Sequence, residues 1–383
     1  MSDAIIPFKV EIGSAGIEDL RRRLAATRWP DAETAGDWSQ GIPLAYMQEV
    51  CTYWATQYDM QRVAKRLNAF PQFRTRIDGL GIHFLHVRSP HADALPLVMT
   101  HGWPGSVIEF LNVIEALTDP TRHGGEAKDA FHVVCPALPG YGFSDKPPAR
   151  GWGVERIGRA WGELMQRLGY ASYVAQGGDW GSMVTSSIAM TETAHCRGIH
   201  LNMPLVAPDP DTMSDLSASE QAALAAMQDY YENESGYSKQ QSTRPQTLGY
   251  GLADSPAGQA AWILEKFRAW TDCGEGEARH PENALTRDEL LDNVMMYWLT
   301  DSAASSARLY WESFNTPSMA PITIPVGASI FPKEIFRTSR RWAEKRFARL
   351  VHWNELERGG HFAAFEQPQL FVGELRACFR AMR

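Results

Sequence analysis

Hydrophobic and polar positions follow two different periods along the chain, and the change between them divides it. In the first part, apolar side chains recur every three or four positions, as in helices buried on one face. The stretch 17–29 ends before Pro30 and places on one face Ile17, Leu20, Leu24 and Ala25. Two further helices are predicted over 44–57 and 59–67. Residues 1–72 are therefore predicted to form a helical extension packed on a larger body.

From residue 73 the pattern changes to short runs of β-branched and aromatic residues, which predict strands. These runs cover 82–89, 95–102, 131–138, 172–179, 322–330 and 348–356. Helical segments separate the later runs, and such alternation is typical of parallel strands joined by crossover helices. Residues 209–318 have no strand signal and predict helices rich in Tyr, Trp and Met. We therefore predict one α/β domain built from 73–208 and 319–383, with 209–318 inserted as a helical lid.

Composition and charge exclude several classes of function. The 383 residues are 44% hydrophobic and 21% charged, which is ordinary for a globular protein. The net charge of −8 argues against nucleic acid or an anionic membrane as the main partner. Five scattered cysteines without CxxC spacing indicate neither a disulfide framework nor a metal site. Because no signal peptide or long apolar run is found, a cytoplasmic location is expected.

The segment that ends the predicted strand at 172–179 has the spacing of a nucleophile elbow. Gly177 and Gly181 stand two residues before and two residues after Asp179. A sharp turn from a strand into a helix crowds these two positions, so small residues are required there. The usual serine is absent from the centre of the motif, so Asp179 is the candidate nucleophile and the chemistry must differ.

An aspartate in this place favours a reaction through an ester. A carboxylate is ionised at neutral pH, so it can displace a leaving group at a saturated carbon without a base. The ester must then be hydrolysed, which requires an activated water molecule and donors for an oxyanion. A glycine-rich turn in which Asp179 only caps the next helix would have the same spacing. The remaining residues of the site must therefore distinguish the two interpretations.

The acid and the base of such a site follow the nucleophile in chain order. His361 comes after the last predicted strand and next to two glycines, where the base is expected. Glu334 comes just after the strand at 322–330 and is the candidate acid, with Asp209 as the competing one. Taken alone, the histidine would more often be structural, and Glu334 has a charged neighbour, as a surface residue would. Their order after Asp179 favours a catalytic triad.

Two backbone N–H groups are the candidate oxyanion hole. One belongs to Trp180, the residue after the nucleophile, and the other lies in the loop 101–105. Within that loop Trp103 is the expected donor, because Pro104 has no N–H. A plain turn would also contain glycine and proline, so this loop supports the site only in combination with the elbow.

These motifs resemble the epoxide hydrolases of the α/β-hydrolase fold, in the branch similar to microsomal epoxide hydrolase. The likeness covers nearly the whole chain and includes HGWPG at 101–105, GGDWGS at 177–182, and the segments 138–147, 236–256 and 358–368. The resemblance implies a mostly parallel central sheet with helices on both faces, an N-terminal extension and an inserted lid. Unlike the membrane-bound members, this chain shows no N-terminal anchor. Family precedent favours a homodimer.

The resemblance also implies conversion of hydrophobic epoxides to vicinal diols without a cofactor or a metal. Two lid tyrosines of the family bind the epoxide oxygen and protonate the alkoxide, and the matching positions are Tyr237 and Tyr310. Without this match the residues alone do not select a pair, because the lid also contains Tyr230, Tyr231, Tyr250 and Tyr297. An alkoxide is a poor leaving group, so a proton donor makes chemical sense. The expected substrate site is therefore lined by Trp103, Trp180 and these two tyrosines.

Two other functions share parts of this pattern. A haloalkane dehalogenase also has an aspartate followed by tryptophan on this fold, and a non-catalytic small-molecule binder would keep the pocket. The loop HGWPG lacks the polar asparagine usual in a dehalogenase, and a binder usually loses part of the catalytic set. A serine esterase is disfavoured, because Ser182 stands three residues after the centre of the elbow.

Overall fold

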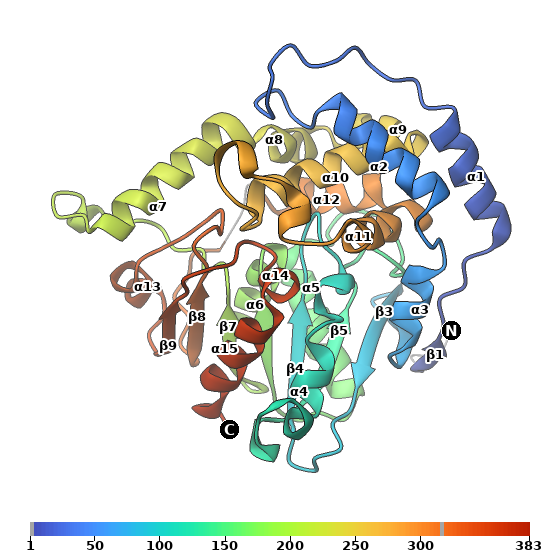
Figure 1. Ribbon diagram of the computed structural model, residues 1–383. Helices are drawn as coiled ribbons and strands as arrows, with labels where there is room; N and C mark the ends of the chain where they lie inside the picture. The colour runs from blue at the N-terminus through green and yellow to red at the C-terminus, as the bar shows by residue number, and fades with distance from the viewer. Residues whose placement is uncertain (1–3, 315–317) are drawn as a thin grey trace.

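A nine-stranded sheet forms the centre of the computed structural model, which describes residues 4–314 and 318–383 (Figure 1). Its order is β1-β2-β3-β5-β4-β6-β7-β8-β9. The strands are β1 (Ile6–Phe8), β2 (Gln72–Ile77), β3 (Leu80–Val87), β4 (Leu95–Thr100), β5 (Phe131–Pro136), β6 (Tyr173–Gly177), β7 (Cys196–Leu201), β8 (Val326–Ile330) and β9 (Leu350–Glu355). Pairing is parallel from β5 through β9 and antiparallel among β1, β2, β3 and β5. The mostly parallel sheet predicted from the sequence is confirmed.

Each predicted strand overlaps an observed strand, with ends shifted by a few residues. The largest difference is at 322–330, where only Val326–Ile330 forms a strand. Ile322 makes only an isolated bridge with Phe347. Pro325 separates Ile322 from the start of β8, and it has no N–H to continue the ladder of hydrogen bonds. The predicted runs do not include β1, a three-residue strand, or β2, the strand with which it pairs.

Helices cover both faces of the sheet (Figure 1). Helices α4 (Ile114–Thr118) and α15 (Pro368–Arg380) lie on one face, and α5 (Val154–Arg167) and α6 (Trp180–Thr191) lie on the other. Strands β6 and β8 are buried along their whole length. This burial explains why their sequences are nearly continuous apolar runs rather than alternating patterns.

The chain between β7 and β8 is helical where the structure describes it. Its α-helices are α7 (Ala218–Asp229), α8 (Gly236–Thr243), α9 (Pro245–Asp254), α10 (Pro256–Trp270), α11 (Arg287–Leu299) and α12 (Ala303–Ser313). They lie above the ends of the central strands, next to the helices of the N-terminal extension (Figure 1). The ends of parallel strands and the residues of this helical layer therefore face each other across one interface.

The extension contains the three predicted helices, but one of them ends early. Helix α1 (Ser14–Ala25) stops before 29, and Ala25 is exposed rather than on the buried face. Pro30 cannot donate to the carbonyl group one turn earlier and restricts the residue before it, so its effect reaches upstream. Helices α2 (Leu44–Thr56) and α3 (Arg62–Asn68) lie close to their predicted positions. No helix in the described ranges has both the length and the hydropathy needed to cross a bilayer.

A buried carboxylate joins the extension to helix α11. Asp292 has no solvent-exposed side-chain surface and accepts bonds from Arg62 at 3.0 Å, Arg66 at 2.7 Å and the Tyr58 hydroxyl at 2.7 Å. Its removal would leave two arginines without their shared partner. We expect Asp292→Ala to lower the free energy of unfolding by about 3 kcal/mol, measured by urea denaturation.

The control for this variant lies one turn earlier on the same helix. Asp288 is 34% exposed, and its carboxylate is 3.8 Å from Arg62. Exposed pairs contribute little, so Asp288→Ala should cost less than about 1 kcal/mol. Equal losses in the two variants would show that the buried cluster is not what attaches the extension.

Candidate active site

The turn between β6 and α6 holds Asp179 in a strained conformation. Its φ of 51° and ψ of −129° lie outside the regions that ordinary residues adopt. A Cβ atom on Gly177 would overlap the carbonyl oxygen of Gly181, and one on Gly181 would overlap the carbonyl oxygen of Thr100. Both glycines are therefore required by contact with backbone atoms, as the elbow spacing predicted.

The loop after β4 contacts the carboxylate of Asp179 directly. The backbone N–H of Trp103 donates to Asp179 Oδ1 at 2.8 Å. A Cβ atom on Gly102 would overlap the same oxygen, so glycine is needed for this close approach. Trp180 is the first residue of α6, immediately after Asp179. The structure thus places both predicted oxyanion donors beside Asp179: Trp103 makes a hydrogen bond to it, and Trp180 follows it in the chain.

His361 lies between two carboxylates. Its Nε2 is 3.3 Å from Asp179 Oδ2, and its Nδ1 is 2.6 Å from Glu334 Oε1. Only 2% of the His361 side chain and 1% of the Glu334 side chain are exposed. Burial alone would lower the pKa of His361, but Glu334 and Asp179 outweigh it and raise this pKa well above its usual value. While Asp179 is charged, the imidazole is therefore held protonated and in a fixed orientation, and loss of that charge lowers its pKa again.

The loops of Glu334 and His361 are also joined through their backbones. Lys333 and Gly360 form an isolated parallel bridge, and the Lys333 N–H donates to the Gly359 carbonyl oxygen at 3.1 Å. Glu334 is therefore a buried partner of the histidine and not a surface charge. The competing acid, Asp209, pairs instead with Lys345 at 3.3 Å.

Two tyrosines from the helical layer face the elbow across a box of aromatic rings. Tyr237, on α8, stacks on Trp103 with ring centroids 4.9 Å apart, and Tyr310, on α12, meets Trp180 edge-on at 4.7 Å. The two tyrosine rings are 5.8 Å apart. Burial raises the pKa of both hydroxyl groups well above the usual value, and the charge of Asp179 adds to this effect. Both hydroxyls are therefore protonated and available as donors at neutral pH.

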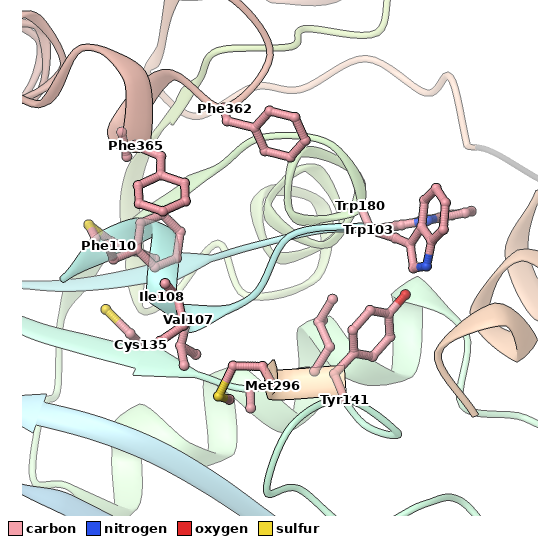
Figure 2. Close-up of a cluster of buried hydrophobic side chains, with 14 of the residues drawn as sticks. Trp103, Val107, Ile108, Phe110, Cys135, Tyr141, Trp180, Met296, Phe362 and Phe365 are labelled. Carbon is pink, nitrogen blue, oxygen red and sulfur yellow. The ribbon is translucent and has the colours of Figure 1, made fainter. Parts of the chain in front are cut away.

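The site is continuous with the hydrophobic core. The hydrophobic cluster in Figure 2 includes Phe110 and Cys135 as well as Trp103 and Trp180, the two tryptophans next to Asp179. Cys135 is buried in β5 and Phe110 in the turn after the Trp103 loop. Such packing holds the loop of Trp103 in place and gives the site apolar walls.

Three residues of this region were not identified in the sequence. The carbonyl oxygen of Trp270 accepts the N–H of His361 at 2.9 Å, and the Tyr230 hydroxyl is 3.1 Å from the hydroxyl of Tyr237. The carboxyl group of Glu109 lies in the cavity next to Asp179 and His361. Only Glu109 had a sequence signal, because it follows the HGWPG loop closely; Trp270 and Tyr230 reach the site from distant helices.

No metal site was found in the part of the chain that the structure describes. Among those residues, no three His, Cys, Asp or Glu side chains are grouped as a bound ion would require. The polar atoms of the site instead bond one another in the chain Glu334–His361–Asp179–Trp103.

Two family descriptions match the sequence. Residues 5–110 match the family described as "Epoxide hydrolase N terminus", and residues 96–247 match "alpha/beta hydrolase fold". A protein of Stigmatella aurantiaca, provisionally named an epoxide hydrolase, is 59% identical over 380 residues, which cover 99% of this chain and 86% of that protein. Epoxide hydrolase 1 of Sus scrofa is 36% identical over 400 residues, with 98% and 88% covered.

Solved structures give the same result. The juvenile hormone epoxide hydrolase of Bombyx mori superposes with a TM-score of 0.91 at 31% identity, covering 100% of this chain and 95% of that chain. The epoxide hydrolase of Aspergillus niger superposes with a TM-score of 0.89 at 32% identity, covering 99% and 97%. The chain thus belongs to the epoxide hydrolases of the α/β-hydrolase fold, enzymes that add water to an epoxide.

Proposed function

We propose that this epoxide hydrolase works in two covalent steps with Asp179 as the nucleophile. The observation that carries the proposal is that each oxygen of the Asp179 carboxylate contacts a different group of the site. Its Oδ1 accepts the Trp103 N–H at 2.8 Å, and its Oδ2 lies 3.3 Å from His361 Nε2. Oδ1 is suited to remain the carbonyl oxygen of an ester, because the donor that would stabilise an oxyanion already binds it. Oδ2 is then the atom that attacks.

In the first step Oδ2 displaces the epoxide oxygen from one ring carbon. The bond from carbon to Oδ2 forms as the bond from carbon to the ring oxygen breaks. Tyr237 and Tyr310 bind that oxygen and supply the proton it needs to leave. The raised pKa of both hydroxyls and their position in the aromatic box support this role. His361 is protonated beside the charged carboxylate and returns a proton to the tyrosine once the ester has removed that charge. The product of this step is a hydroxyalkyl ester of Asp179.

In the second step His361 takes a proton from water, whose oxygen attacks the ester carbon. The oxyanion that develops is stabilised by the N–H groups of Trp103 and Trp180. The bond between the ester carbon and the alkyl oxygen then breaks, and that oxygen takes the proton from His361. The carboxyl group left on Asp179 gives its remaining proton to His361, which restores the starting state. Glu334 orients the imidazole through Nδ1 and stabilises its charged form, a role supported by the 2.6 Å contact.

The substrates we propose are hydrophobic aryl or alkyl epoxides. The supporting observation is the aromatic lining by Trp103, Trp180, Tyr237 and Tyr310, all of them buried. The relatives named above are epoxide hydrolases, which favours ring opening over dehalogenation. A turnover panel of epoxides graded by size and polarity, with halide release measured in parallel on haloalkanes, tests both statements.

The division into an extension (1–72), a lid (209–318) and a two-part core (73–208 and 319–383) is part of this proposal. A cytoplasmic location is also part of it and is supported by five buried cysteines without disulfides. The homodimer stays a prediction from family precedent, and light scattering on the purified protein measures it directly.

A single turnover in oxygen-18 water tests the ester mechanism. With enzyme in excess over substrate, the diol of the first turnover should carry no label, because its new oxygen comes from Asp179. The label should instead enter the carboxylate of Asp179, and later turnovers should release it into product. Mass spectrometry of the diol and of the peptide containing Asp179 gives both readouts. Label in the first diol would mean that water attacks the epoxide directly.

A further inference from the structure

A second buried carboxyl group lies beside the catalytic residues and has no role in the steps above. Glu109 belongs to a short 3-10 helix, Val107–Phe110, after the Trp103 loop, and is 9% exposed. Within residues 4–314 and 318–383, no lysine or arginine forms an ion pair with it. Burial raises the pKa of Glu109 to about 8; the charge of His361 opposes this shift and that of Asp179 adds to it. Glu109 is therefore mostly neutral at pH 7 and close to both catalytic groups.

The carboxyl group opens onto a small cavity shared with the site. The cavity has a volume of about 20 Å³, and its lining includes Asp179, His361, Gly105 and Glu109. About 10–15 Å³ suffices for one water molecule, provided that polar groups surround it. The cavity therefore fits one water molecule and is too small for an epoxide substrate.

The loop that precedes Glu109 is shaped to admit its carboxyl group. A Cβ atom on Gly105 would overlap Glu109 Oε1, so a larger residue at 105 would displace the carboxyl. Helix α11 fixes the same loop: Asn293 donates to the Pro104 carbonyl oxygen at 2.7 Å, and Tyr297 donates to that of Gly105 at 2.7 Å. The position of Glu109 is thus determined by contacts on both sides of the interface between core and helical layer.

The residues next to Glu109 in its short helix are apolar. Val107, Ile108 and Phe110 lie in the buried hydrophobic cluster (Figure 2). A carboxyl group in such a place costs free energy unless it is hydrogen-bonded. Glu109 accepts a hydrogen bond from the backbone N–H of Ser106. A carboxyl group has two oxygens, so one can bind this N–H while the other binds a water molecule in the cavity.

We propose that Glu109 positions the water molecule that hydrolyses the Asp179 ester, an inference that rests on the two-step mechanism proposed above. When the ester forms, the carboxylate of Asp179 loses its charge, and His361 Nε2 becomes free to accept a proton from water. The water in the cavity gives one hydrogen to Nε2 and donates the other in a hydrogen bond to the C=O oxygen of the Glu109 side-chain carboxyl group. Its lone pair then points at the ester carbon. Glu109 neither gains nor loses a proton in the cycle, so it is a positioning residue.

Two substitutions of similar size separate this role from a structural one. Glu109→Gln keeps a carbonyl acceptor and a donor, whereas Glu109→Met keeps the volume and removes both. With styrene oxide as the probe, we expect Glu109→Met to slow hydrolysis of the ester by about 10- to 100-fold. Its alkylation step, followed by quenching of tryptophan fluorescence, should stay within about twofold of the wild type. Glu109→Gln should restore hydrolysis to within a few-fold, and the ester at Asp179 should accumulate only in the Met variant.

Glu366 is the matched control. It is a partly buried carboxyl whose pKa is also raised by desolvation, to about 7, but its oxygens accept the N–H groups of Asp272 and Phe362. Glu366→Gln should leave the ratio of hydrolysis rate to alkylation rate unchanged. Equal losses in both steps for Glu109→Met, or normal hydrolysis in that variant, would overturn the positioning role and leave the ester mechanism intact. No adduct at Asp179 in any variant, His361→Gln included, would overturn both.

Discussion

His361→Gln is expected to turn this enzyme into one that alkylates itself once and then stops. Steady-state turnover of styrene oxide should fall by about 10⁴-fold or more, because glutamine cannot accept a proton from water. The first step should persist, since attack by the carboxylate of Asp179 on a ring carbon needs no base. Intact mass spectrometry should then show one added substrate mass, and peptide mapping should locate it on Asp179.

His352→Gln is the matched control for this variant. His352 pairs with Glu374 at 2.8 Å on strand β9, so it has the same histidine–glutamate contact as the site but no contact with the nucleophile. The His352→Gln variant should turn over styrene oxide without accumulating an adduct on Asp179. If His361→Gln shows no adduct while it remains folded, the histidine acts before the ester forms and the division into two steps is wrong.

The double substitution of Tyr237 and Tyr310 by phenylalanine should block the reaction at the earlier step. Alkylation of Asp179 should slow by about 10³- to 10⁴-fold, because the leaving alkoxide then has no proton donor. Each phenylalanine keeps the ring and its contacts with Trp103 and Trp180, so the shape of the site is retained. Rapid-quench detection of the adduct in a His361→Gln background measures this step separately from hydrolysis.

Tyr58→Phe controls for the loss of a buried hydroxyl elsewhere. This tyrosine is also buried and donates to Asp292 at 2.7 Å, outside the site. It should lower stability without slowing alkylation. An alkylation rate in the Tyr237/Tyr310 double variant equal to that of Tyr58→Phe would exclude these two tyrosines as the donors.

The local features of the fold, such as the turn at Asp179, were the ones most readily predicted from the sequence. The spacing of Gly177, Asp179 and Gly181 predicted the sharp turn correctly, because each glycine is required by a contact within the turn or with the adjacent strand end. The mostly parallel sheet followed from apolar runs separated by helices, since strands buried on both faces leave that pattern. Predictions were least accurate at the ends of elements, where a single proline changed the outcome: Pro30 ended α1 early and Pro325 shortened β8.

The order of residues along the chain predicted a base at His361, but it left two candidate acids open. Glu334 and Asp209 both follow strands, and only the tertiary structure brings Glu334 to His361 and Asp209 to Lys345. The lid tyrosines were open in the same way without the family resemblance. Tyr231 and Tyr250 are 59% and 73% exposed, whereas Tyr237 and Tyr310 face the aromatic box.

The sequence by itself therefore determined the turn, the alternation of strands and helices, and the chemical character of Asp179, because these depend on neighbours a few positions apart. Tertiary structure alone decided the contacts of Trp270 with His361, of Tyr230 with Tyr237, and of Glu109 with the cavity. Each of these contacts joins elements far apart in the chain or depends on how closely a loop packs. Periodicity and spacing carry no information about such distances, because only the packing of the lid on the sheet sets them.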